Sequence, residues 1–67
     1  MRHDYLQSIK KAISSPATAQ SLVRQGVGCL EDVYAALVRL EASGQARVVM
    51  AYQSTESKPV AFWESMQ

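Results

Sequence analysis

The sequence has few of the residues on which cross-links, metal sites and membrane anchors depend. It contains one cysteine, Cys29, and one histidine, His3. A lone cysteine forms no internal disulfide, and one residue of each type cannot complete a tetrahedral metal site within a monomer. No apolar run approaches the roughly 18 residues of a membrane-spanning helix, and the N-terminal stretch MRHDYLQSIKK lacks the apolar segment of a signal peptide. We therefore expect a cytoplasmic protein without metal or cofactor.

Neither sign of charge dominates the sequence. Seven lysines and arginines stand against six acidic residues, which gives a formal net charge of +1. A dedicated nucleic-acid-binding domain of this size is usually more basic. The sequence also has no glycine-rich phosphate loop and no nucleophile motif, and so short a chain has few apolar residues to spare for an enclosed active site. We expect one binding domain over residues 1–67, and no enzyme.

Two amphipathic helices are predicted from apolar residues at helical spacing. The first covers about residues 4–14 and ends before Pro16, which disfavours helical geometry at Ser15. The clearer one covers about residues 30–43 and ends at Gly44. We expect their apolar stripes to build the core: Tyr5, Leu6, Ile9, Ala12 and Ile13 in the first helix, and Leu30, Val33, Leu37 and Leu40 in the other.

A shorter helix is predicted between these two, and its end is clearer than its start. It reaches about Gln25. Either Ser15 caps it with Pro16 in the first turn, or Thr18 caps a shorter version. Residues 26–28, the sequence GVG, indicate a tight turn after it. Helix, turn and helix in this order form a helix-turn-helix.

The remaining chain changes to the periodicity of β-strands. Residues 46–52 and 60–63 are rich in β-branched and aromatic side chains, and the polar stretch QSTESKP between them suits a hairpin loop. Alternation leaves open which face of the hairpin is buried. It does place Phe62 and Trp63 on opposite faces. We expect Phe62 to pack on the helices and Trp63 to be the exposed one.

The order of these elements and three stretches of sequence resemble the winged helix-turn-helix superfamily, in particular its small bacterial or phage-type regulators. The resemblance covers about residues 4–64 and is carried by TAQSLVRQGV, VYAALVRLEASGQARVV and KPVAFW. It implies an α+β fold of three helices and a two-stranded β-hairpin wing, and binding of double-stranded DNA as a small transcriptional regulator or accessory factor. One departure is that the third helix opens with Glu31 and Asp32, where DNA-binding members often carry polar or basic groups.

If DNA is the ligand, the third helix is the candidate for the major groove. Its outer face offers Tyr34, which can hydrogen-bond a base, and Val38, which can touch a thymine methyl group. Phosphate contacts need basic side chains gathered on one side. Four lie on the helix-turn-helix and the wing: Arg24, Arg39, Arg47 and Lys58. For each of them alone, scattered surface charge is the plainer interpretation.

A protein-interaction module is the alternative, in which the apolar outer face of the third helix or the wing binds another chain. The low net charge and the acidic start of the third helix favour it. Because specific operators usually engage two recognition helices, we also expect a homodimer or a partner-assisted complex, with Trp63 or the first helix at the contact. Cys29 is interpreted as a structural thiol, with a redox role as the alternative.

Overall fold

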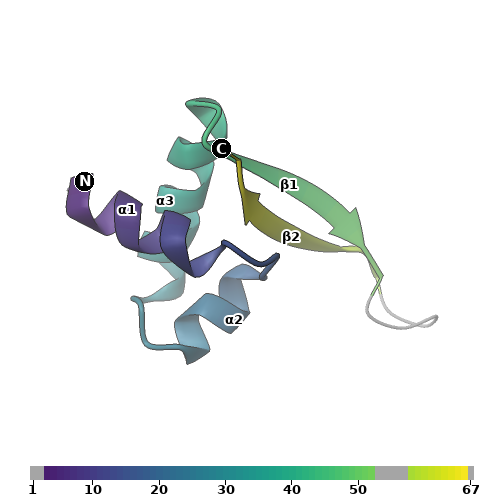
Figure 1. Ribbon diagram of the computed structural model, residues 1–67. Helices are drawn as coiled ribbons and strands as arrows, with labels where there is room; N and C mark the ends of the chain where they lie inside the picture. The colour runs from purple at the N-terminus through teal and green to yellow at the C-terminus, as the bar shows by residue number, and fades with distance from the viewer. Residues whose placement is uncertain (1–2, 53–57, 67) are drawn as a thin grey trace.

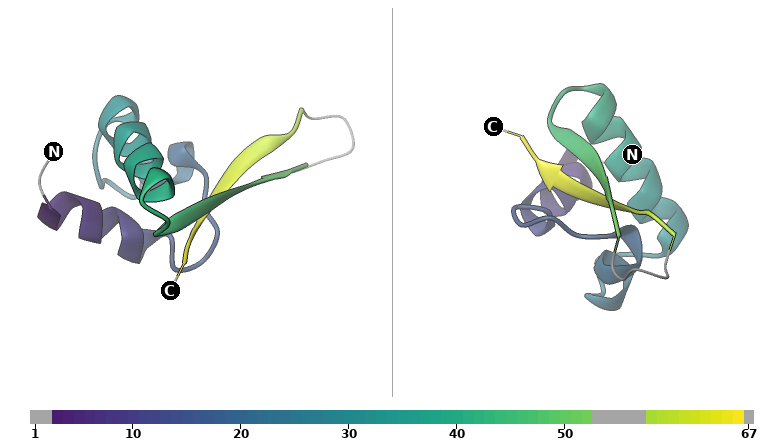
Figure 2. Two further views of the ribbon diagram at one scale, coloured as in Figure 1. Left: turned by 90° about the horizontal axis from the view of Figure 1, so that it is seen from above. Right: turned by 90° about the vertical axis from the view of Figure 1, so that its right-hand side faces the viewer.

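Three helices precede a two-stranded antiparallel hairpin, so the fold is α+β (Figure 1). The computed structural model describes residues 3–52 and 58–66. In chain order the elements are α1 (His3–Ala12), α2 (Ala19–Arg24), α3 (Leu30–Ala42), β1 (Ala46–Ala51) and β2 (Val60–Ser65). The helices gather at one end and the hairpin projects away from them, as Figure 2 shows from two further sides.

The core lies between the three helices and the base of the hairpin. Its buried apolar residues are Ile9, Ile13, Ala19, Leu22, Val33, Ala36, Leu37, Leu40, Ala46 and Trp63. Tyr5, Leu6 and Ala12 of α1 pack against this cluster from its edge. The apolar stripe predicted for the first helix is therefore confirmed.

The link between α1 and α2 is tied to the hairpin, which the sequence did not indicate. α1 ends at Ala12, earlier than the expected Ser14, and the chain then becomes extended. Ala17 forms an antiparallel bridge with Trp63. The Ala17 N–H donates to the Trp63 carbonyl at 3.0 Å, and the Trp63 N–H donates to the Ala17 carbonyl at 2.8 Å. This bridge holds the base of β2 against the helices.

Thr18 is the residue that caps α2. Its hydroxyl oxygen accepts a hydrogen bond from the Ser21 N–H at 3.0 Å, which satisfies one of the free donors of the first turn. Of the two predicted starts, the one at Thr18 is confirmed. The start at Ser15 is wrong because Ala17 is extended and uses both of its backbone groups in the bridge.

α3 buries one side and exposes Leu30. Its buried residues are Val33, Ala36, Leu37 and Leu40. Leu30, predicted to belong to the same stripe, is 47% exposed. That prediction is wrong because Leu30 is the first residue of α3, at the end of the helix that borders the groove described below and not the core. The helix stops where predicted, at Gly44, whose φ is +78°.

β1 and β2 pair so that one face of the hairpin is buried in the core at its base and exposed toward its tip. Val48 lies opposite Trp63, and Met50 lies opposite Ala61. Opposed residues share a face, so these four side chains are on the face that packs on the helices at its base. Met50, nearer the tip, is 61% exposed.

Trp63, and not Phe62, is the aromatic residue of the core. Trp63 is only 5% exposed, whereas Phe62 is partly buried on the opposite face. The expectation for this pair is therefore wrong, because the bridge from Ala17 fixes which face of β2 meets the helices. A dimer contact through Trp63 loses its support for the same reason.

Candidate functional site

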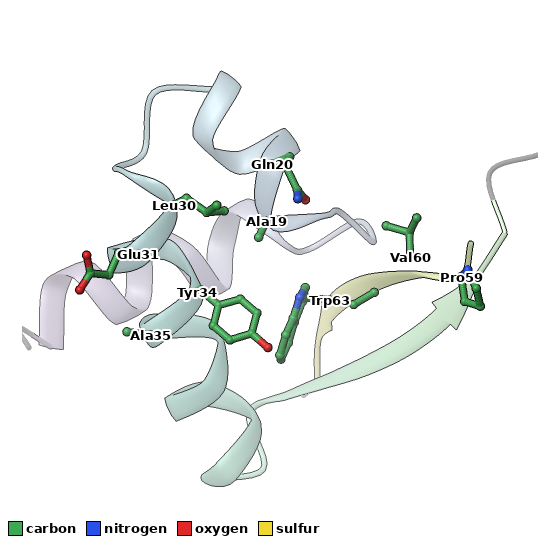
Figure 3. Close-up of a pocket in the computed structure, with 10 residues that line it drawn as sticks. Ala19, Gln20, Leu30, Glu31, Tyr34, Ala35, Pro59, Val60 and Trp63 are labelled. Carbon is green, nitrogen blue, oxygen red and sulfur yellow. The ribbon is translucent and has the colours of Figure 1, made fainter. Parts of the chain in front are cut away.

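An apolar groove lies between α3 and β2, bordered by the start of α2 (Figure 3). Its lining residues are Ala19, Gln20, Leu30, Glu31, Tyr34, Ala35, Pro59, Val60, Ala61 and Trp63. All except Gln20 and Glu31 are aliphatic or aromatic. Among the described residues, no lysine or arginine lines the groove. Its surface is therefore suited to an apolar ligand and is weakly acidic.

Tyr34 and Trp63 form the aromatic part of this lining. Figure 3 shows the two rings facing each other from α3 and β2. Their centroids are 5.9 Å apart and their planes meet at 85°, an edge-to-face arrangement. Trp63 is fixed by its bridge to Ala17, while Tyr34 is 54% exposed. The accessible Tyr34 ring thus packs against the buried Trp63 ring. Tyr34 therefore loses little side-chain freedom when a ligand binds.

A line of exposed apolar side chains continues from the groove along α3. Leu30, Tyr34 and Val38 follow one another at four-residue spacing, which places them side by side on the helix. All three are exposed large hydrophobic residues, as are Val48 and Met50 on the hairpin face that carries Trp63. Exposed apolar surface of this kind marks binding sites more often than it marks bare surface.

The residues predicted to bind DNA divide between the groove and its surroundings. Tyr34 lines the groove, and Val38 lies one turn further along α3. Arg39 is turned roughly 140° round the helix from Tyr34. Arg24 ends α2 and Lys58 precedes Pro59, and both side chains are exposed. The structure therefore brings Tyr34 and Val38 together, but it places none of the cationic residues in the groove.

Arg47 is engaged on the other face of the hairpin. Its Nε donates to the Glu64 carboxylate in a cross-strand ion pair. Each partner is next in sequence to Val48 or Trp63, so the pair points away from the groove face. The Arg47 side chain is 60% exposed and keeps further donors, but a phosphate approaching it would also meet the charge of Glu64.

On the β2 side of the groove, sequence reasoning named Trp63 as a contact but missed Pro59, Val60 and Ala61. For the α3 side a signal existed: Leu30, Tyr34 and Val38 form a second apolar line beside the buried one. No local pattern identified the bridge between Ala17 and Trp63, because it joins distant parts of the chain.

Tyr5 sets the turn from which α3 starts. Its hydroxyl is buried, and among the described residues it has no hydrogen-bond partner. It lies where a side chain at Gly28 would be. Burial raises the pKa of Tyr5 above its ordinary value of 10.0, and the nearby charges of Asp32 and Cys29 raise it further. α1 thus meets the turn before α3 at Gly28, where the Tyr5 hydroxyl occupies the space of a side chain.

The described residues give little support for a metal site or for a membrane-spanning helix. In the part of the chain that the structure describes, no three histidine, cysteine or acidic residues come together as metal ligands, and no helix is long and apolar enough to cross a bilayer. Cys29 is a free, exposed thiol. Comparisons with family models, curated proteins and solved structures gave no match.

Proposed function

We propose that this chain is a small winged-helix interaction module that binds a partner protein in the groove between α3 and β2. The observation that carries the proposal is the lining, which is mainly apolar and aromatic and has no cationic side chain among the described residues. Protein interfaces concentrate their binding energy where aromatic residues meet a partner in a desolvated pocket. Tyr34, exposed and braced by Trp63, has the position of such a residue.

The same lining disfavours nucleic acid in the groove. Base edges are read mainly by arginine, lysine, asparagine and glutamine, and phosphates are neutralised by cations. The groove offers Gln20 and the carboxylate of Glu31, with Asp32 in the same first turn of α3. Two acidic side chains at this helix start would repel a phosphate backbone.

DNA binding by the outer face of α3 is the second candidate. The observation that favours it is the exposure of Val38 and Arg39 on this helix, together with Arg24 and Lys58 on the neighbouring elements. In this candidate the protein is a small transcriptional regulator, acting as a homodimer or with a partner. Both candidates place it in the cytoplasm, and the free thiol of Cys29 suits a reducing compartment.

Site-specific photo-crosslinking in the native cell separates the candidates. Benzoylphenylalanine replaces Tyr34, and a matched variant carries it at Ser8, an exposed position on α1. We expect a discrete protein adduct from position 34 and none from position 8. A nuclease-sensitive adduct from position 34 would instead support DNA, and an adduct with the mass of two copies would identify a homodimer.

A duplex titration tests the second candidate directly. Under the leading proposal, mixed-sequence duplexes bind weakly even at low salt, and Lys58→Ala changes little. If DNA is the ligand, binding weakens with salt by a log–log slope of about 0.9 per phosphate neutralised, and each phosphate-contacting residue accounts for about one unit. Tight, steeply salt-dependent binding would therefore overturn the leading proposal.

A further inference from the structure

The outer edge of β2 is only partly covered. Trp63 directs both backbone groups away from β1 and pairs them with Ala17. The Ser65 N–H points the same way and donates to the Ile13 carbonyl at 2.9 Å. Backbone groups alternate along a strand with a period of two residues. The N–H and carbonyl of Ala61 therefore also point to this outer edge.

Within residues 3–52 and 58–66, no segment pairs with the edge of β2 at Ala61. The extended segment that pairs with Trp63 runs antiparallel to β2, so its continuation would lie opposite Ala61. The chain instead leaves at Thr18 and enters α2. Among the described residues, no hydrogen bond outside the β1–β2 ladder uses either backbone group of Ala61. Pairing along this edge of β2 therefore stops at Trp63 in the part of the chain that the structure describes.

The unpaired edge at Ala61 borders the groove. Pro59, Val60 and Ala61 form one wall, while Ala19 and Gln20 of α2 lie on the side where the third strand is interrupted. In Figure 3 the β2 wall stands across from Leu30 and Tyr34 of α3. A free backbone donor and acceptor therefore border an apolar channel that ends on the aromatic pair.

We propose that the groove binds its partner as an extended peptide segment that adds to the edge of β2 at Ala61. This inference rests on the proposed function. The segment pairs its backbone with Ala61 and lays an apolar side chain against Tyr34 and Trp63, a recognised mode of peptide binding. Glu31 is the charged side chain of the lining. The segment therefore carries a lysine or arginine, and not an acidic residue, at the position that lies next to Glu31.

A helical segment is a poorer occupant for a physical reason. The backbone groups of a helix are already paired within it, so a helix covering Ala61 would bury its N–H and carbonyl without partners. An unsatisfied buried backbone group costs more than a made hydrogen bond gains. An extended segment supplies both partners at the same time.

The test uses four variants of the full chain, one of them Tyr34→Ala, and peptides selected from a displayed random heptapeptide library. Ala61→Pro removes the edge N–H and leaves the ladder with β1 intact, since that N–H is not part of it. Ala61→Val keeps the N–H and adds bulk. Met50→Pro, at the residue opposite Ala61, removes the corresponding N–H on the outer edge of β1.

We expect selected peptides to lose affinity about three- to tenfold with Ala61→Pro, the effect of one net hydrogen bond. Met50→Pro should bind as the native chain does, and Ala61→Val should lose less affinity than Ala61→Pro because it keeps the N–H. Amide exchange at Ala61 should slow in the complex. Peptides that need Tyr34 but are indifferent to Ala61→Pro, without protection at Ala61, would overturn strand addition and leave the proposed function standing.

Two other outcomes also decide against the inference. If no peptide is enriched, or if binding is indifferent to Tyr34→Ala, the groove is not the binding site and the proposed function fails with it. If sedimentation shows a dimer of the native chain that Ala61→Pro dissociates, the edge is occupied by a second copy and not by a partner peptide.

Discussion

Alanine at Gly28 tests how closely the turn before α3 is set against α1. Gly28 has a φ of +151°, which L side chains rarely adopt, and a Cβ there overlaps the Tyr5 hydroxyl. Backbone strain of this kind costs about 1–3 kcal/mol, and forcing atoms into an occupied site costs about 1–3 kcal/mol more. We expect Gly28→Ala to lower the free energy of unfolding by about 2–6 kcal/mol.

Two controls separate the causes of this loss. Gly26, in the same turn, has a φ of +82° but open space where its Cβ would lie, so Gly26→Ala carries only backbone strain, about 1–2 kcal/mol. Tyr5→Phe removes the obstructing oxygen. That oxygen is buried without a partner among the described residues, so Tyr5→Phe alone should be neutral or stabilising. Combined with Gly28→Ala, it should recover about 1–2 kcal/mol.

Urea unfolding followed by tryptophan fluorescence measures all four variants. Trp63 is the single tryptophan and is buried, so its emission reports the loss of the core. Two results would refute the reasoning: equal losses for Gly28→Ala and Gly26→Ala, or no recovery in the double variant. Either would mean that the Tyr5 hydroxyl does not restrict the turn.

The same assay checks three further predictions. Leu37→Ala should lower the free energy of unfolding by about 2–5 kcal/mol because Leu37 is fully buried. Val38→Ala, on the exposed side of α3, should change it by no more than about 0.5 kcal/mol. Similar losses for the two variants would contradict the assignment of buried and exposed sides to α3. Thr18→Ala should cost about 1 kcal/mol through the lost cap, with Ser15→Ala nearly silent. Because the folded state raises the pKa of Tyr5, its protonated form favours folding. That contribution is complete below pH about 10 and is lost as pH rises further, so Tyr5→Phe should lose less stability than the native chain above that pH.

Sequence periodicity predicted the parts of the fold that depend on neighbours in the chain. The inward faces of α1 and of most of α3 follow from apolar spacing, and Gly44 marks the end of α3 because a left-handed residue stops a helix. For the N-cap of α2, the sequence left two candidate residues. Ser15 and Thr18 offer the same hydroxyl chemistry, so local sequence could not separate them.

The errors fall where distant segments decide the outcome. Alternation shows that Phe62 and Trp63 face opposite ways, but only the bridge from Ala17 determines which one is buried. Leu30 fits the helical period, yet it lies at an end of α3 that borders a groove and not the core. The candidate site divides in the same way. Its α3 side could be predicted from the apolar spacing along that helix, whereas Pro59, Val60 and Ala61 on its β2 side could not.

The bridge between Ala17 and Trp63 also sets the order of events in folding. Helices and hairpins form from contacts between near neighbours, whereas joining distant segments must first offset the entropy of closing a long loop. We therefore expect the Ala17–Trp63 pairing to form late in folding, after local turns of helix and the β1–β2 turn have begun to form. The groove exists only after that closure, so a chain with its full secondary structure but an undocked hairpin has no binding surface to offer.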